Sequence, residues 1–415
     1  IVNNGSQTGF GRTGTVDWQT GSIKTGTFTA VNGEGYFVDT SSGVSTANLP
    51  AGSAGAIVSF ADYTRTFQTN NLTITPNGSE KIGGIASNFV ALTEGQSITL
   101  VYVDATEGWV NTAESTGQSG LTPAFICASS PCVATVGDYK IHTFTGPGTF
   151  CVSCAGNPLG SGSVDYMVVA GGGGGGGENS SNASGGGAGA GGYRESSGAA
   201  SGCYTASPLG AGVSALPVSV QGYSIAIGGG GTGGVGSSSY GTNGAISTFS
   251  SITSAGGGFG GSRAPGPSVG NPGGSGGGGG LNFTGGTGNT PPVSPPQGQT
   301  GGGGTPATSA AGGGGAGAVG GCAPSSSVAG PGGAGATSSI NATPTARAGG
   351  GGGGGQSTGG TGGTGGGGAG ANGNANGTAG ADNTGGGGGG AYDTSGGSTG
   401  GAGGSGIVII RYKFQ

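Results

Sequence analysis

The chain has 415 residues and a formal net charge of −5, and 116 of its residues (28%) are glycine. Average proteins contain about 7% glycine. With only 6% charged residues and one histidine, the composition argues against an enzyme, a basic nucleic-acid-binding surface and a highly charged disordered chain. The longest apolar stretches, residues 164–170 and 407–410, are too short to span a bilayer, which needs about 20 residues.

Residues 1–120 are predicted to form an all-β module. Short alternating stretches occur at Gly26 to Val31, Asn71 to Thr75 and Ser97 to Val103, and turns such as Asn32-Gly33 separate them. A module of this size buries a modest core, and small all-β modules often complete theirs by oligomerising. The expected core residues are Trp18, Phe28, Phe37, Phe60, Phe67, Leu72, Ile74, Leu100, Tyr102 and Trp109.

Residues 121–170 are predicted to be a connector that starts the glycine-rich part. Asp138 to Phe150 alternates on both sides of Gly146-Pro147-Gly148, which predicts a β-hairpin, and an apolar strand is expected at Val164 to Ala170. A closing strand is expected in residues 407–415. The strands at residues 164–170 and 407–415 would form a small sheet that clamps both ends of residues 171–406.

Residues 161–415 hold 93 of the glycines, in runs such as Gly171 to Gly177 without a G-X-Y period, which excludes collagen. Glycine loses much backbone entropy on folding and buries no side chain, so something else must hold such a region together. Packed polyglycine II helices, threefold and extended, would do so through lateral N–H···O=C bonds. The alternative is a set of flexible linkers. We favour a bundle over residues 171–406, because the interruptions carry Tyr, Phe and Cys.

Two parts of the chain resemble phage proteins. GTFTAVNGEGYFVD (Gly26 to Asp39), Asp62 to Gly84 and LVYVDATEGW (Leu100 to Trp109) resemble a β-structured module of fibres and other appendage proteins of marine tailed phages. This resemblance implies a homotrimeric shaft or knob. The alternative is an ordinary β-sandwich without a partner.

The second resemblance covers residues 121–415. VDYMVVAGGGGGGG (Val164 to Gly177), GAISTFSSITSAGGGFGG (Gly244 to Gly261) and GSGIVIIRYKF (Gly404 to Phe414) look like the glycine-rich domain of phage tail-fibre adhesins. The resemblance implies a rigid polyglycine II sandwich whose end loops touch a host receptor. The six cysteines depart from that pattern, so their role is not implied by it.

The spacing of the cysteines is compatible with several chemical states. Cys127 and Cys132, with Cys151 and Cys154, have a spacing suited either to a structural zinc or to disulfides, as two local bridges or one crossed pair. Free thiols are the third alternative. Cys203 and Cys322 would staple two loops if they face each other. His142 lies in an expected strand, where a structural role is favoured.

Loop residues are the expected contacts for a ligand, since aromatic faces and amides suit sugars and protein loops. The alternative is that these residues cap the bundle. The candidates are Tyr204, Tyr240, Arg263, Asn282, Phe283, Pro291, Pro292, Pro295 and Pro296.

The sequence thus favours a non-enzymatic virion appendage, a phage tail fibre that recognises a host-cell surface glycan or outer-membrane protein. The expected partners are two further copies in a homotrimer and other virion tail or fibre proteins, with no nucleic acid, membrane span or cofactor. An extracellular structural or ice-binding glycine-rich protein is the alternative. A fibre-borne depolymerase ranks last, because paired carboxylates are lacking.

Overall fold

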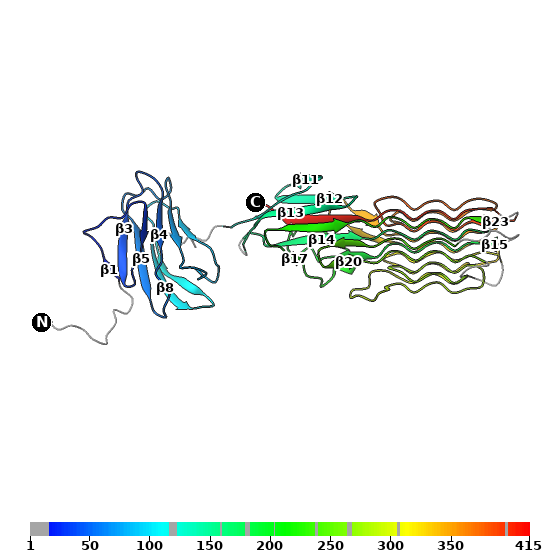
Figure 1. Cartoon of the computed structure of the whole chain (residues 1–415), viewed down its shortest axis with the longest axis horizontal. Coiled ribbons are helices and arrows are strands. Elements are labelled where there is room, and N and C mark those ends of the chain that lie inside the picture. The colour runs from blue at the N-terminus through cyan, green and yellow to red at the C-terminus, as the bar shows by residue number, and fades with distance from the viewer. Residues whose placement is uncertain are drawn as a thin grey trace. The chain divides into compact units, whose positions relative to one another are not determined.

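The computed structural model describes residues 16–115, 123–157, 160–178, 183–202, 204–236, 240–263, 268–304, 308–394 and 397–415. In this described part, the regular elements are β-strands and one 3-10 turn, η1 (Pro208–Gly210), so the expected all-β fold class is confirmed. None of it forms a helix that is long and apolar enough to cross a bilayer. Two compact units make up the chain (Figure 1): unit 1 is residues 1–124 and 157–159, and unit 2 is residues 125–156 and 160–415.

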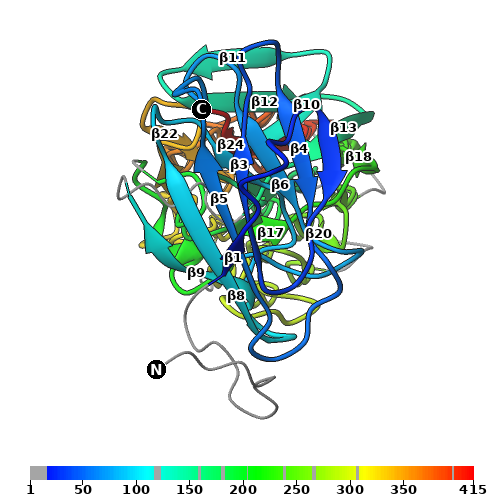
Figure 2. The same cartoon turned by 90° about the vertical axis from the view of Figure 1, so that its left-hand side faces the viewer.

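Unit 1 contains two sheets whose first strands alternate along the chain. One sheet has the order β1 (Asp17–Trp18), β3 (Glu34–Val38), β5 (Ile57–Asp62), β8 (Ser97–Asp104), β9 (Gly108–Glu114), and the other β2 (Thr27–Thr29), β4 (Ser45–Asn48), β6 (Leu72–Thr75), β7 (Phe89–Ala91). Since the chain visits the sheets in turn, β1, β3 and β5 pair in parallel, as do β2, β4 and β6. Figure 2 shows β3 beside β5 and β4 beside β6.

The core of unit 1 is built from residues of both sheets. Most of the expected core residues are in it: Phe60, Phe67, Leu72, Ile74, Leu100 and Trp109 are buried, and Phe28 and Tyr102 pack against them. The prediction is wrong for Trp18 and Phe37, whose rings pack on each other with centroids 5.0 Å apart and leave Trp18 39% exposed. Tyr36 and Val38 point inward, so Phe37, between them in β3, points to the other face of the sheet.

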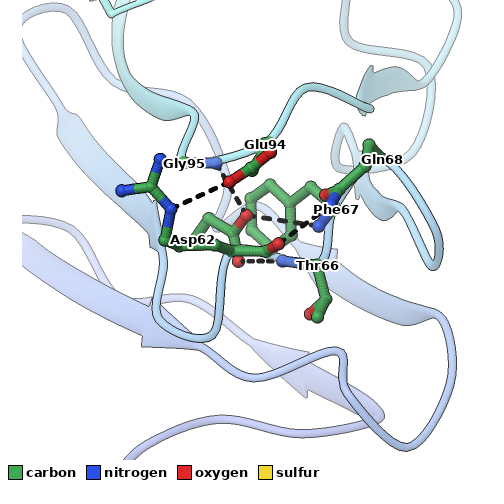
Figure 3. Close-up of polar contacts among 7 residues, drawn as sticks. Asp62, Thr66, Phe67, Gln68, Glu94 and Gly95 are labelled. Atoms are coloured by element: carbon green, nitrogen blue, oxygen red, sulfur yellow. Dashed lines mark hydrogen bonds and ion pairs between the residues drawn. The ribbon is translucent and has the colours of Figure 1, made fainter.

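The Asp62 carboxylate at the end of β5 joins two loops of unit 1 (Figure 3). One carboxylate oxygen accepts the N–H of Thr66 at 3.1 Å, and the other accepts those of Phe67 at 3.2 Å and Gly95 at 3.0 Å. These bonds fix the loop that delivers the Phe67 ring to the core, where this residue is 1% exposed. Asp62 therefore couples loop conformation to core packing.

Unit 2 begins with two further sheets. One has the order β10 (Ile126–Ser129), β13 (Gly148–Ala155), β18 (Gly222–Ala226), β19 (Ser247–Phe249), β20 (Ile252–Ser254), and the other β11 (Val133–Val136), β12 (Tyr139–Phe144), β24 (Ile407–Lys413), β14 (Ser163–Val169), β16 (Tyr193–Glu195), with β17 (Leu216–Pro217) paired to β14. One apolar cluster, which includes Phe150, Phe249 and Tyr412, joins these two sheets, and we call the pair of sheets the sandwich. A second cluster includes Met167 and Ile340. Along β14 and β24, the side chains of this cluster alternate with side chains of the first cluster.

The expected clamp is present. β14 and β24 pair antiparallel, with Asp165 opposite Arg411 and Val169 opposite Ile407, so the strands before and after the glycine runs lie side by side. Two short pairs complete the unit: β15 (Ala183–Ser184) with β23 (Tyr392–Asp393), and β21 (Ala336–Ser338) with β22 (Thr345–Arg347).

The predicted hairpin around Gly146-Pro147 is wrong. β12 pairs with β11 and β24, whereas β13 pairs with β10 and β18. Phe144 and Phe150, on either side of the turn, are buried in one cluster from different sheets. The turn therefore carries the chain from one sheet to the other, because this arrangement buries both rings.

The glycine runs continue from these strands as segments bonded sideways. The N–H groups of residues 171–176 donate, in order, to the carbonyls of Ala245, Gly404, Gly189, Thr242, Gly401 and Gly186. Residues three apart therefore donate to the same neighbour, so successive peptide groups point in three directions around the run. We call these runs together the glycine lattice: residues 171–178, 185–192, 228–235, 240–246, 255–261, 270–280, 284–288, 299–304, 310–321, 329–335, 348–355, 359–370, 375–381, 385–391 and 398–406.

Run 185–192 shows how closely the lattice is packed. Its N–H groups donate to residues of 255–261, 311–314 and 385–391, and its carbonyls accept from residues of 170–176, 275–278 and 351–354. The whole run is buried. Figure 1 shows such runs as neighbouring traces that extend from the sandwich strands toward β15 and β23. Lateral backbone bonds to six segments thus replace a side-chain core along this run.

Glycine is required at most lattice positions because neighbouring backbones occupy the place of a side chain. A Cβ on Gly174 would overlap the carbonyl oxygen of Thr232, and one on Gly175 that of Gly389. Ala188 and Ala190 are fully buried in the same lattice, so a methyl group is accepted where the neighbours leave room.

We expect Asp62→Ala to destabilise unit 1 by about 1–3 kcal/mol, because three backbone N–H groups lose their acceptor. Both tryptophans, Trp18 and Trp109, lie in unit 1, so the fluorescence of the full chain during urea unfolding reports on it. The control is Glu94→Gln, which breaks the 3.0 Å Arg65–Glu94 ion pair, whose side chains are 71% and 53% exposed. Such a pair contributes about 0–1 kcal/mol. Equal losses in both variants would contradict the assigned role of Asp62.

We expect Gly174→Ala to destabilise unit 2 by about 3 kcal/mol or more, because its methyl group has to displace backbone. The matched control is Gly229→Ala, where a Cβ meets no atom within 4 Å. That substitution should change stability by less than about 1 kcal/mol. Calorimetry of the full chain, with hydrogen exchange of lattice amides, measures both. Similar effects at the two sites would show that backbone contact does not select glycine.

Candidate functional site

The lateral bonds determine the end of the lattice at which each loop lies. Gly171, two residues after β14, donates to Ala245, and Gly174 donates to Thr242, so run 240–246 is antiparallel to the run that leaves β14. Tyr240 therefore lies at the end remote from β14. We call this the distal end of the lattice, and β15 and β23 lie there (Figure 1).

Three more candidates lie at the distal end. Arg263 lies two residues after Gly261, whose carbonyl accepts the N–H of Gly186 near that end. The backbone N–H of Arg263 donates to the buried carboxylate of Glu178 at 3.1 Å. Asn282 and Phe283 form the turn after Gly280. All three candidates are exposed.

Apolar side chains are exposed at the distal end on neighbouring segments. Val235 is 62% exposed, Tyr240 43%, Val269 42% and Phe283 41%, and we call these four residues the distal patch. Tyr240 stacks on Phe259 with a centroid separation of 5.2 Å. The segments are joined by backbone bonds: Thr242 to Thr232, Asn271 to Phe259, and Gly270 to Thr284. The patch thus spans adjacent, mutually bonded segments.

Amides border this patch. The Asn271 side chain donates to the Asn243 side-chain oxygen at 2.9 Å, and the same oxygen accepts the N–H of Phe259 at 3.0 Å. The Asn282 amide is exposed beside Phe283. The described part of the distal end therefore combines aromatic rings, with Tyr240 stacked on Phe259, with amide groups.

The proline candidates lie at the opposite end of the lattice. Gln297 fixes their loop: its side chain donates to the Pro291 carbonyl at 2.8 Å and accepts the N–H of Ala255 at 2.8 Å, and its backbone carbonyl accepts the N–H of Tyr193. Ala255 follows β20 and Tyr193 begins β16, so this loop lies next to the sandwich strands. Pro291, Pro292, Pro295 and Pro296 are not part of the distal end.

Tyr204 is also away from the distal end. It lies between β16 and η1, and its ring is 5.2 Å from the Arg411 guanidinium, which is itself 3% exposed. Burial raises the pKa of Tyr204 far above its ordinary value. These two residues line an open pocket of about 320 Å³ together with Tyr139 and Ser339. Tyr204 is thus embedded in the sandwich part of unit 2.

Five of the six cysteines lie among the described residues, and these five are exposed. Cys127, Cys132, Cys151, Cys154 and Cys322 are free, and Cys203 lies outside the described residues, so its pairing with Cys322 is not described. Cys127 lies directly opposite Cys154 across β10 and β13. No three His, Cys, Asp or Glu side chains within the described ranges converge as a metal site.

A family model described as a glycine-rich domain matches residues 143–413. The chain belongs to this glycine-rich domain family. The match includes β14, β24 and the whole glycine lattice between them. A comparison with curated proteins found no match.

The glycine-rich domain also contains buried charged residues that the sequence patterns did not single out. Asp165 is fully buried in β14 and accepts bonds from the Ser196 hydroxyl at 2.7 Å and the Ser201 N–H at 2.6 Å. Glu195, 1% exposed, accepts bonds from Tyr193 at 2.9 Å and the Ser207 hydroxyl at 2.6 Å. Burial raises the pKa of Glu195, and the hydroxyl bonds oppose this shift. These residues fix Ser196, Ser201 and Ser207 against the sheet, which is a structural role.

The one clue in the sequence is a charge inside each of two apolar strands. Asp165 interrupts VDYMVV and Arg411 interrupts IVIIRYKF, and the structure places these two residues opposite each other across the β14–β24 pair. The sequence pattern alone does not define the pairing register of β14 and β24. Without that register, it could not show that Asp165 and Arg411 lie opposite each other.

His142 is structural as well. It is fully buried in β12; its Nδ1 lies 2.7 Å from the Ser130 hydroxyl and its Nε2 lies 3.2 Å from the Tyr412 hydroxyl. Its ring is stacked on Tyr412 at 5.5 Å. Burial, with a smaller contribution from Lys140, lowers the pKa of His142 from 6.5 to about 4. The neutral ring is therefore part of the packed core.

This shift predicts how unit 2 responds to acid. The unfolded chain binds a proton near pH 6.5 and the folded chain only near pH 4, so stability is full above pH 6.5 and falls as the pH drops from 6.5 to 4. The loss should reach up to about 3 kcal/mol. Because the chain has one histidine, its NMR titration assigns the pKa directly. A midpoint near 6.5 in the folded protein would contradict this account.

Proposed function

We propose that this protein is a bacteriophage tail-fibre protein, a virion appendage that attaches to the host-cell surface through the distal end of its glycine-rich domain. The observation that carries the proposal is the distal patch, where four apolar side chains are exposed on hydrogen-bonded neighbouring segments. Where exposed apolar side chains gather into one contiguous patch, they mark an interaction site.

The backbone of the lattice supports this role mechanically. We propose that its runs are polyglycine II helices, because residues three apart donate to the same neighbour, as a threefold extended helix requires. Backbone bonds hold the runs beside two of the exposed rings, from Thr242 to Thr232 near Tyr240 and from Gly270 to Thr284 near Phe283. Loops that are ordered before binding lose less entropy on contact.

The chemistry of the distal end favours a host-cell glycan as the ligand. The rings of Tyr240 and Phe283 offer apolar faces, and Asn282 offers an amide that donates and accepts hydrogen bonds. Sugars expose C–H faces and hydroxyl groups that match both. An outer-membrane protein is the competing receptor class.

We further propose that unit 1 forms a homotrimer that joins other virion tail or fibre proteins, and that the protein binds without catalysis. Three copies would present three distal patches on one appendage. Linked weak sites bind a surface far more tightly than one site does, provided that they engage at the same time.

The test uses the labelled full chain, a panel of bacterial cells and an array of surface glycans. The double variant Tyr240→Ala/Phe283→Ala should bind cells and glycans at least about tenfold more weakly, since each ring buries contact area. The matched control is Ile246→Ala/Val319→Ala, which removes two side chains that are 56% and 59% exposed away from the distal end.

Other outcomes discriminate between the alternatives. Unchanged cell binding by the distal variant would overturn the assigned site, and binding lost after protease treatment of cells would favour a protein receptor. A monomer in light scattering would contradict the trimer. Thermal hysteresis of the purified chain without cell binding would favour the ice-binding alternative.

A further inference from the structure

Two exposed thiols face each other near the start of unit 2. Cys127 in β10 is the direct antiparallel partner of Cys154 in β13. Directly opposed residues in such a pair have Cα atoms about 4.5–5.5 Å apart. Disulfides form where the Cα separation is about 4.4–6.8 Å. The backbone therefore already holds these cysteines at a bridging distance.

The side chains are on the same face of the sheet. A bulge follows Cys127, and beyond it the buried Val152 pairs with Ala128, while both cysteines remain exposed. The Ser153 hydroxyl donates to the Cys127 carbonyl at 3.2 Å and ties the bulge down. The neighbouring Cys154 side chain raises the pKa of the Cys127 thiol.

We propose that Cys127 and Cys154 form a redox-responsive dithiol that closes to a cross-strand disulfide in an oxidising medium. With a low-molecular-weight disulfide as oxidant, the thiolate of one cysteine attacks it and releases one thiol. The second cysteine then attacks the mixed disulfide and releases the other thiol. The protein loses two protons and two electrons, and the oxidant gains both as two thiols.

The position of the pair gives the bridge a consequence. β10 is an edge strand held by β13 alone within its sheet, and it is the first strand after residue 124, where the first segment of unit 1 ends. A covalent bond to β13 prevents this strand from detaching. The bridge also closes the loop between residues 127 and 154, which restricts the unfolded chain. Oxidation therefore strengthens the point where the chain enters unit 2. This inference does not depend on the proposed function.

The other two nearby cysteines provide the matched control. Cys151 faces Ser129 across the same strand pair, whereas the Cys132 carbonyl accepts the Thr143 N–H at 3.2 Å, beside the other sheet. We compare Cys132→Ser/Cys151→Ser, which keeps the proposed pair, with Cys127→Ser/Cys154→Ser, which removes it. Both full-length variants retain the same number of cysteines.

Each reduced protein is incubated with mixtures of reduced and oxidised glutathione, alkylated and digested with trypsin. Cleavage after Lys140 separates Cys127 from Cys154, so their bridge links peptides 82–140 and 141–194. We expect this link in the wild type and in Cys132→Ser/Cys151→Ser. Oxidation should raise the melting temperature of unit 2 in these two proteins by about 5 °C or more.

The inference is overturned if Cys127→Ser/Cys154→Ser forms the linked peptides as readily, or if Cys132→Ser/Cys151→Ser stays reduced where exposed thiols of the same protein are glutathionylated. Hydrogen exchange of unit 2 in the reduced variants checks that both are folded. A link without any change in the protection of β10 amides would overturn its stapling role.

Discussion

Lateral satisfaction of backbone hydrogen bonds is the constraint on which the glycine-rich domain depends. An extended run makes no helical bonds, so each buried N–H has to find a carbonyl on another run. In run 185–192 the donors are directed in turn to three neighbours, and the acceptors serve three others. The segments must then approach so closely that the oxygen of Gly389 occupies the place of a side chain at Gly175. The glycine content is thus a geometric consequence of the bonding.

The sandwich strands supply the order that glycine cannot provide. Polyglycine contains no side-chain pattern that would fix register, because each residue is like the next. The β14–β24 pair sets the register of the first and last runs through Val169 opposite Ile407, and β16, β18, β19, β20 and β22 adjoin further runs. Apolar clusters in the sheets therefore position the lattice, and the lattice in turn positions its distal loops.

The sequence predicted where the strands lie better than it predicted which strands pair with each other. The strands at residues 164–170 and 407–414 and the lateral bonding could be read from apolar runs and glycine runs. The hairpin at Gly146-Pro147 could not, because burial of Phe144 and Phe150 between two sheets outweighs local pairing. The proline loop was expected with Tyr240, yet antiparallel runs place their loops at alternate ends of the lattice. Which end a loop occupies depends on how many runs precede it, a global property.

In the proposed function, binding is carried by the ends of the runs. Inside the lattice, a larger side chain would break bonds to several neighbours at once, so interior positions have little freedom to vary. Loops such as those at Tyr240 and Phe283 carry no such restriction, since their side chains extend into solvent. The same lattice can therefore present different side chains without a change in its backbone, much as other scaffolds place variable loops on a fixed framework. The bonded backbone and the exposed loop side chains therefore belong to separate parts of one chain, and the number of bonded runs limits how wide the face formed by their ends becomes.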